Sequence, residues 1–171
     1  MRSLGEQVID LELLARHQGS AFGPMNKWDQ PTQEQFENEL ALELYQLDIT
    51  KRIWLENESI VIGRISIPRN LFNQMRETHI INLNVPVEER INFLNKEYGV
   101  LDKEFLKTST LKISKRLGPL ETKLTLQAIE ENRMTDFIKH VLVYYDKTYE
   151  RGQLKRAPSK IHQLDAETID P

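Results

Sequence analysis

The chain has 171 residues, of which 39% are hydrophobic and 29% are charged, and its formal net charge is −3 at pH 7. This length suits one domain with a genuine core, and the negative charge supplies no overall basic field that would draw the chain onto nucleic acid. The absence of cysteine excludes disulfides, thiolate metal sites and cysteine nucleophiles. No apolar run is long enough to span a membrane. We therefore predict a cytoplasmic protein without membrane contact, which could meet RNA only through a local patch.

The first predicted elements are the end of a helix, a strand and a loop. Gly5 suits the left-handed position that follows a helix, and the apolar residues over 7–11 predict a short strand. Because a domain rarely opens on a helix end, we expect a missing upstream segment. The stretch "DLELLARHQGSAFG", residues 10–23, then passes from an apolar run into a loop with a histidine, two glycines and a serine. Taken alone, this loop is either a connector or a ligand-binding loop.

A helix and a buried strand follow that loop. Thr32 and Gln35 predict a capping box at the start of the helix, and apolar residues then recur every three to four positions from Phe36 to Leu47. The run "KRIWLENES" predicts a buried strand whose carboxyl end lies at Glu56.

The second half of the chain is predicted to be mainly helical. A short helix "RNLFNQMRE" and a strand "HIINLNV" precede "VEERINFLNKEYG", and Asp102 and Gly118 then bound a further helix. Two more helical segments follow, and the polar chain from Gly152 onward predicts a loose tail. Strands that alternate with helices, followed by a helical run, predict an α/β fold with a small parallel sheet. We expect one domain over 1–151 and a flexible tail over 152–171.

Polar side chains gather at the predicted carboxyl ends of three strands, where open parallel sheets bind ligands. The first strand end leads to Asp10, His17, Gly19, Ser20, Phe22 and Gly23, the second to Glu56, Glu58, Ser59, Gly63 and Arg64, and the third to Pro86, Glu88, Glu89 and Arg90. A carboxylate such as Glu56 can hold a magnesium-bound water, although buried strands often end in an acid because the chain reaches solvent. His17 is either a general base or a structural residue, and the glycines either admit a phosphate or supply turn geometry.

Two helix-borne arginines, Arg90 and Arg116, are further candidates for phosphate binding, because a guanidinium can bind phosphate oxygens in bidentate fashion. The structural alternatives are ion pairs of Arg90 with acidic neighbours and a favourable position of Arg116 near its helix C-terminus. Lys155, Arg156 and Lys160 either touch RNA phosphates or belong to a solvated tail.

Four stretches together resemble the C-terminal domain of the tRNA 2-selenouridine synthase family, over about residues 4–150. They are "GEQVIDLELLARHQGSAFG", "QPTQEQFEN", "RIWLENESIVIGRISIP" and "VPVEERINFLNKEYG". The loop H-x-G-S-x-F-G, followed by E-x-E-S and I-G-R-x-x-x-P, makes this resemblance specific.

The resemblance implies a transferase that replaces the sulfur of wobble 2-thiouridine in tRNA with selenium. Selenophosphate is the implied selenium donor, geranyl diphosphate supplies a geranylated intermediate, and the fold is a three-layer, P-loop kinase-like α/β fold beside a rhodanese-like domain with a catalytic cysteine. We predict Glu56, Glu58 and His17 as catalytic residues. The predicted substrate- or phosphate-binding residues are Asp10, Gly19, Ser20, Gly23, Ser59, Arg64, Arg90 and Arg116; Glu12, Phe22 and Gly63 also match family positions. No metal ligand is assigned, and magnesium beside a diphosphate stays open.

The sequence departs from the family in ways that matter for phosphate chemistry. The family's loop G-x-x-x-x-G-K-[ST] would lie just upstream of residue 4, and neither it nor the rhodanese cysteine occurs in the 171 residues. Asn57 and Ile60 replace an acid and an arginine of the family pattern, which removes charge from the predicted site. Leu13, Arg16 and Gln18 also differ from that pattern.

These departures lead to one leading hypothesis and two rivals. We expect an N-terminally truncated or split synthase domain that is inactive alone and regains a central strand from a complementary chain carrying the rhodanese and P-loop segments. The rivals are a non-catalytic module for tRNA binding or assembly, and a small-molecule kinase-like enzyme.

Overall fold

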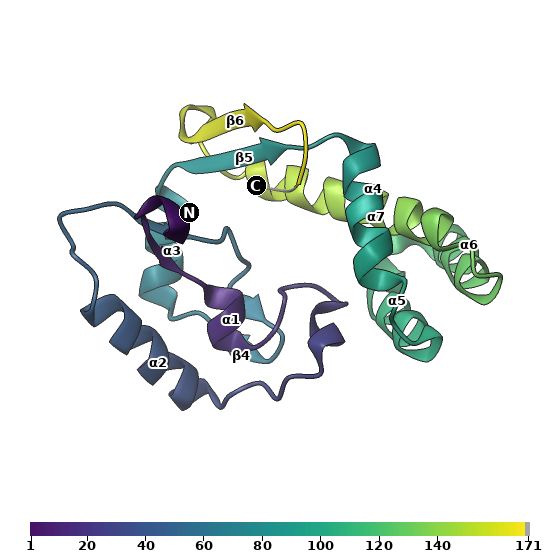
Figure 1. Cartoon of the computed structure of the whole chain (residues 1–171), viewed down its shortest axis with the longest axis horizontal. Coiled ribbons are helices and arrows are strands. Elements are labelled where there is room, and N and C mark those ends of the chain that lie inside the picture. The colour runs from purple at the N-terminus through teal and green to yellow at the C-terminus, as the bar shows by residue number, and fades with distance from the viewer. Residues whose placement is uncertain (170–171) are drawn as a thin grey trace. The chain divides into compact units, whose positions relative to one another are not determined.

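The structure, a computed structural model, describes residues 1–169 of the chain. The chain forms two compact units, Met1–Arg76 and Glu77–Pro171 (Figure 1). This division differs from the predicted boundary at residue 151, so the view of 1–151 as one functional domain stays a prediction.

The N-terminal unit consists of short elements joined by loops. In chain order these are η1 (Arg2–Leu4), β1 (Gln7–Ile9), α1 (Leu11–Ala15), η2 (Gly23–Asn26), α2 (Gln33–Tyr45), β2 (Ile53–Leu55), β3 (Val61–Ile62), β4 (Ile65–Ser66) and α3 (Arg69–Glu77). Thr32 caps α2 by accepting the Gln35 N–H at 3.1 Å. The Gln35 side chain donates instead to Glu39 at 2.6 Å, so the predicted capping box forms only on its Thr32 side.

Strands β1 and β2 pair in parallel, with Val8 opposite Trp54, and α2 lies between them in the sequence as a crossover. The predicted parallel pairing of the first two strands is therefore confirmed. Strands β3 and β4 form an antiparallel hairpin that the sequence pattern did not predict. Its turn depends on Gly63, whose φ of 62° is accessible to glycine at little cost.

One hydrophobic core joins β1, α1, α2, the hairpin and α3. Its buried members are Ile9, Leu11, Ala15, Phe36, Leu40, Ile62, Ile65, Ile67 and Met75. Each large apolar side chain buried in this way stabilises the fold by about 1.5–3 kcal/mol. The core holds the carboxyl ends of β1 and β2 in place beneath the loops that follow them.

The C-terminal unit is mainly helical. Its elements are β5 (Ile80–Asn84), α4 (Val87–Tyr98), α5 (Lys103–Leu117), α6 (Pro119–Glu130), α7 (Met134–Gln153), η3 (Pro158–Lys160) and β6 (Ile161–Asp165). Asp102 caps α5 by accepting the N–H groups of Glu104 and Phe105 at 2.9 and 3.1 Å. Gly118, with φ of 93°, ends α5 and precedes Pro119 at the start of α6.

The predicted loose tail contains an ordered strand, because β6 pairs in parallel with β5 over five residues. Side chains reinforce this ladder: Asn82 donates to Gln163 at 2.7 Å, and the rings of His79 and His162 stack with nitrogens 2.8 Å apart. The buried Arg156 donates to the Thr78 carbonyl at 3.0 Å. Polar pairing and the backbone ladder therefore order a segment that lacks an apolar pattern.

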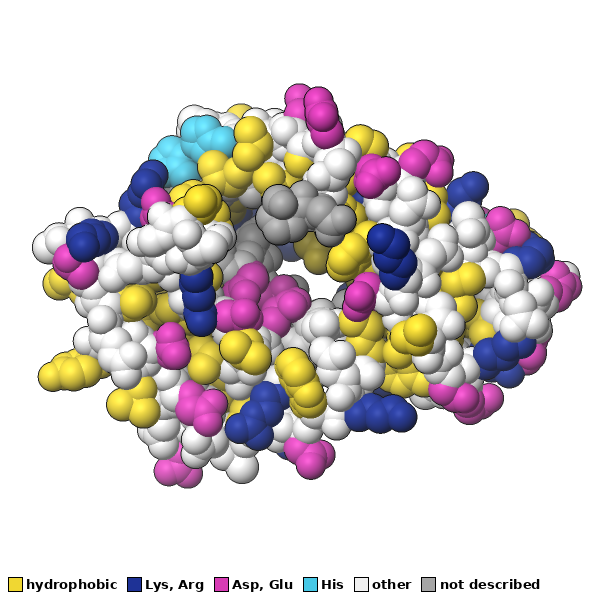
Figure 2. Space-filling model, viewed as in Figure 1, with side chains coloured by type: hydrophobic (Ala, Val, Ile, Leu, Met, Phe, Trp, Pro, Cys, Tyr) yellow, Lys and Arg dark blue, Asp and Glu magenta, His cyan; other side chains and the backbone are white. Residues whose placement is uncertain are grey.

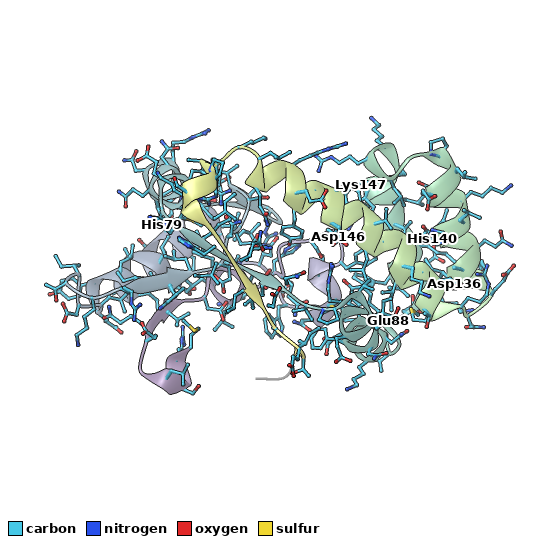
Figure 3. The ribbon with its side chains drawn as sticks, turned by 90° about the horizontal axis from the view of Figure 1, so that it is seen from above. His79, Glu88, Asp136, His140, Asp146 and Lys147 are labelled. Carbon is cyan, nitrogen blue, oxygen red and sulfur yellow. The ribbon has the colours of Figure 1, made fainter. Side chains whose placement is uncertain are left out.

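The helices of this unit pack around buried residues of α5, α6 and α7. These include Leu106, Ile113, Ala128, Ile129, Phe137, Ile138 and Val141. Helix α4 joins them through Tyr98, whose ring lies 6.1 Å from that of Phe137. Figure 3 shows the polar side chains of His140, Asp146 and Lys147 along α7.

The architecture confirms the predicted α/β class with small parallel pairs and a following helical region, and it is consistent with a P-loop-like fold. One part of the prediction was wrong. Strand β5 pairs with β6, and within residues 1–169 it shares no ladder with β1 or β2, so the third predicted strand belongs to a different sheet. Over residues 1–169, no helix is both long and apolar enough to cross a membrane.

Candidate active site

The candidate site lies where β1 and β2 end side by side, as expected for parallel neighbours. Asp10 follows β1 and caps α1, accepting the Leu13 N–H at 2.7 Å. Glu56 follows β2 and accepts the Leu11 N–H at 2.8 Å. Two carboxylates thus hold backbone donors of the first turn of α1. In Figure 2, acidic side chains gather on the surface over α1.

A second pair of carboxyl groups, Glu12 and Glu58, lies beside this turn, and the two side chains hydrogen bond to each other. Gly19 faces the pair: a Cβ there would stand 2.7 Å from Glu58 Oε2 and 2.9 Å from Glu12 Oε1. Its φ of 63° also favours glycine. Because Gly19 has no side chain, the turn can lie directly against the two carboxyl groups.

Burial and neighbouring acids raise the pKa of Glu12 to about 7. Loss of solvent is the largest cause, followed by repulsion from the charges of Glu58, Glu56 and Asp10. Near neutral pH, Glu12 is therefore divided between its protonated and ionised forms. It can give or take a proton at that pH, as a general acid or base requires.

Burial also raises the pKa of Glu58, but three groups oppose this shift by stabilising its charge. These are the Ser59 N–H, the hydrogen bond from Glu12, and the charge of Arg76. Arg76 also donates to the Glu58 carbonyl at 3.1 Å and to the Asn57 side chain. Burial also raises the pKa of Glu56, and the hydrogen bond from the Leu11 N–H offsets part of that rise. The negative charge of Glu58 is thus better stabilised than that of Glu12. Glu12 is therefore the member of the pair that more readily holds a proton.

The loop over 17–23 is closed by its own backbone bonds. Ser20 N donates to Gln18 O at 2.7 Å, and Gly23 N donates to Ser20 O at 2.9 Å. The Ser20 hydroxyl accepts the Phe22 N–H at 3.1 Å. His17 is only 7% exposed, and its ring packs so closely on Gly23 that a Cβ there would overlap it. This packing favours a structural role for His17, and its predicted role as a general base stays a prediction.

Gln30 fixes the other side of the loop to the β3–β4 hairpin. Its amide donates to the carbonyls of Ala15 and Ile62, both at 3.0 Å, and its oxygen accepts the Arg64 N–H at 2.9 Å. The Arg64 guanidinium in turn donates to the Gln30 carbonyl. The predicted phosphate ligand Arg64 therefore makes structural contacts here.

The predicted phosphate ligands on helices, Arg90 and Arg116, belong to the C-terminal unit. Arg90 forms a two-pronged ion pair with Asp146, including a bond of 3.2 Å. That pairing matches the structural alternative weighed for Arg90. Arg116 lies in the last turn of α5 and lines a pocket of the helical unit. Phosphate binding by either residue stays a prediction.

Magnesium beside a diphosphate, which one or two carboxylates could help to hold, stays a prediction. In the described part of the chain, no group of three or more His, Asp or Glu side chains is placed to hold a metal ion.

Three residues of this site were given no role by the sequence analysis. Glu12 carried a signal, since it follows the strand end at Asp10 by two positions. Gln30 and Arg76 carried none, because their partners are distant in sequence: Gln30 is 32 residues from Ile62, and Arg76 is 18 from Glu58.

A family model described as the tRNA 2-selenouridine synthase AAA domain matches residues 2–170. The chain belongs to this family. The resemblance found in the sequence motifs is therefore confirmed over nearly the whole chain.

Curated relatives support the same assignment. The chain is 32% identical to the tRNA 2-selenouridine synthase of Shewanella frigidimarina over 196 aligned residues, which cover 96% of this chain and 53% of the relative. It is 33% identical to that of Hydrogenovibrio crunogenus, with 88% and 48% coverage, and 41% identical to that of Nitrosomonas eutropha over 54% of this chain and 24% of the relative. The chain thus spans about half the length of the first two of these relatives. No solved structure matches it.

Proposed function

We propose that the chain supplies the acidic half of the active site of a cytoplasmic tRNA 2-selenouridine synthase. The reaction exchanges the sulfur of wobble 2-thiouridine for selenium through a geranylated intermediate, and its co-substrates are geranyl diphosphate and selenophosphate. The observation that carries this proposal is the carboxyl pair Glu12–Glu58 against Gly19, in a chain that belongs to this family.

The carboxyl pair suits the handling of a proton beside an anionic substrate. Near pH 7 Glu12 is present in both its protonated and its ionised form. Glu58 stays the better-stabilised anion because Ser59 N–H and Arg76 support its charge. In the proposed reaction the protonated Glu12 donates to a leaving oxygen or sulfur, and its ionised form accepts a proton from the incoming group.

Phosphate binding requires donors that this acidic cluster does not contain. We propose that a complementary chain or segment with a glycine-rich phosphate loop and a rhodanese cysteine provides them. Preorganised backbone N–H groups and a lysine would then stabilise charge that develops on the diphosphate. The chain by itself is expected to turn over no substrate.

The test measures geranyl and selenium incorporation into a 2-thiouridine tRNA, by the chain alone and with a chain that carries the rhodanese and P-loop segments. We expect incorporation only in the mixture, and a loss of about 10²–10⁴-fold in Glu12→Gln, which removes the proposed proton carrier, and in Glu58→Gln, which removes its partner. Glu37→Gln, an exposed acid on α2, is the matched control and should keep full activity.

Each outcome decides the proposal. Activity of the chain alone would overturn its dependence on a partner, and an inactive mixture would overturn the split enzyme. Binding of tRNA that persists in Glu56→Gln and Glu58→Gln, together with full activity of both variants, would indicate the rival binding or assembly module.

A further inference from the structure

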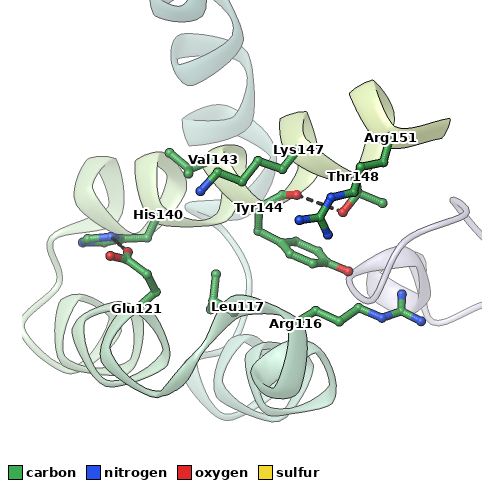
Figure 4. A pocket seen from close by; sticks show the side chains of 9 residues that line it. All are labelled: Arg116, Leu117, Glu121, His140, Val143, Tyr144, Lys147, Thr148 and Arg151. Carbon is green, nitrogen blue, oxygen red and sulfur yellow. Dashed lines mark hydrogen bonds and ion pairs between the residues drawn. The ribbon is translucent and has the colours of Figure 1, made fainter. Parts of the chain in front are cut away.

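A pocket between α5, α6 and α7 collects three cationic side chains. Arg116 comes from the last turn of α5, and Lys147 and Arg151 come from α7. Figure 4 shows Arg116 on one side of the Tyr144 ring, with Lys147 and Arg151 on the other side. The pocket lies wholly within the C-terminal unit.

The α7 side of the pocket is a regular stripe. His140, Tyr144, Lys147 and Arg151 follow one another at spacings of four, three and four residues, which places them on one helix face. Tyr144 is buried at 8% exposure and forms the floor, whereas Lys147 and Arg151 are exposed.

Among the residues that the structure describes, the three cations of the pocket have no acidic partner, unlike two other cations of the same unit. Arg90 pairs with Asp146, and Lys107 pairs with Glu130. Within residues 1–169, no carboxylate lies within ion-pair distance of Arg116, Lys147 or Arg151. Positive charge is therefore concentrated and uncompensated at this pocket.

Neither the helix dipoles nor a neighbouring acid explains all three cations. Cations in the last turns of α5 and α7 stabilise the helix dipoles, which explains Arg116 and Arg151 but not Lys147, since α7 continues to Gln153. Among residues 1–169, the one acid that lines the pocket is Glu121, whose carboxylate lies 2.6 Å from Nδ1 of His140. In Figure 4 this pair lies at the end of the pocket away from Arg116 and Arg151.

We propose that this pocket binds a phosphodiester group of an RNA backbone. Two guanidinium groups can bind phosphate oxygens in bidentate fashion, and an ammonium adds a point charge. The exposed Val143 at the pocket offers an apolar surface for the adjoining sugar. The choice of RNA as the source of the phosphate rests on the proposed function, while the pocket's preference for a phosphate rests on its own charges.

The test is equilibrium binding of the full chain to a tRNA transcript across a series of salt concentrations. The triple variant Arg116→Gln, Lys147→Gln, Arg151→Gln is compared with Lys112→Gln, Lys123→Gln, Lys139→Gln, which removes the same charge from exposed positions of the same unit. We expect the pocket triple to raise Kd by about tenfold or more and to reduce the slope of log Kd against log salt by about 1–3. The control triple should change both quantities much less.

Two results would overturn the inference. They are equal weakening by both triples, which would indicate diffuse attraction, and unchanged binding by the pocket triple. Helix content by circular dichroism checks that both triples fold, and amide shifts of Tyr144 and Thr148 in the unmodified chain give a second measurement that needs no variant.

Titrations with inorganic diphosphate and with the transcript separate the possible sources of phosphate. Shifts of these amides with the transcript support an RNA site, whereas shifts with diphosphate alone overturn it. Because binding is measured without turnover, these results do not depend on incorporation activity. Loss of incorporation in Glu58→Gln with intact tRNA binding would support the proposed function whatever the pocket does.

Discussion

The two units of this chain use charge in opposite ways. The N-terminal unit has eight basic and eleven acidic side chains, and the C-terminal unit has fifteen of each. In the first unit, carboxyl groups are drawn together and partly buried behind two strand ends, which raises the pKa of Glu12, Glu56 and Glu58. In the second unit, cations stand exposed along a helix face.

This difference shows how each kind of site depends on the fold. The acidic cluster needs a backbone turn at Gly19, a core beneath it and the distant partners Gln30 and Arg76. The cationic pocket needs only helical spacing and a neighbouring helix end. The first site should therefore respond to changes in backbone and core, and the second mainly to changes in charge.

Truncation of a core side chain should lower the unfolding free energy more than any of the substitutions that follow, and mainly in the unit that contains it. Phe36 and Phe137 are both fully buried, one in each unit. Replacement of either by Ala should cost about 3–5 kcal/mol of unfolding free energy. Amide hydrogen exchange should lose protection mostly over 1–76 in Phe36→Ala, and mostly over 77–169 in Phe137→Ala. Equal loss over the whole chain in both variants would contradict the division into two units.

A methyl group at Gly19 should disturb the carboxyl pair. Gly19→Ala places a left-handed alanine, at a cost of about 1–2 kcal/mol, against the oxygens of Glu12 and Glu58. Because separation of the pair weakens their interaction, the pKa of Glu12 should fall.

Gly5→Ala is the matched control for this effect, since Gly5 has φ of 78° and nothing lies within 4 Å of the added Cβ. It should show the backbone cost, measured by urea unfolding, without any change in the titration of Glu12. Identical titrations in both variants would show that Gly19 does not shape the pair.

Glu12→Gln should flatten the pH dependence of stability. The folded-state pKa of Glu12 is raised from 4.5 to about 7, so the folded chain takes up a proton in this window, and stability falls as the pH rises through it. The variant should lose less unfolding free energy than the unmodified chain between about pH 5 and pH 8, by on the order of 1–2 kcal/mol after allowance for solvent screening. Parallel curves for the two proteins would contradict the raised pKa.

Loss of the Arg90–Asp146 ion pair should have the smallest effect. Both side chains are partly exposed, so Arg90→Gln should cost at most about 1 kcal/mol in thermal or urea unfolding. Lys112→Gln, an exposed cation of the same unit, should cost less. If Arg90→Gln leaves stability unchanged but weakens tRNA binding as strongly as the pocket triple, Arg90 is a phosphate ligand and its pairing is incidental.

The sequence predicted those parts of the molecule that depend on local signals. Thr32, Asp102 and Gly118 correctly marked helix boundaries, because capping involves residues only a few positions apart. The meeting of Asp10 and Glu56 was also predictable, since parallel strands bring their carboxyl ends to one edge.

Other parts depended on tertiary partners and could not be predicted. Strand β6 is polar and short, and only its ladder with β5 and pairs such as Asn82–Gln163 make it a strand. The contacts of Gln30 join segments up to 34 residues apart. The same holds for the raised pKa of Glu12, which arises from burial among acids on different segments.

The most direct test of the account is a titration of the Glu12 side-chain carboxyl group followed by carbon NMR in the full chain. We predict a midpoint at about 7, which falls when Glu58→Gln removes the neighbouring charge. A midpoint near the ordinary value of 4.5 would contradict the account, because Glu12 would then carry no proton at neutral pH.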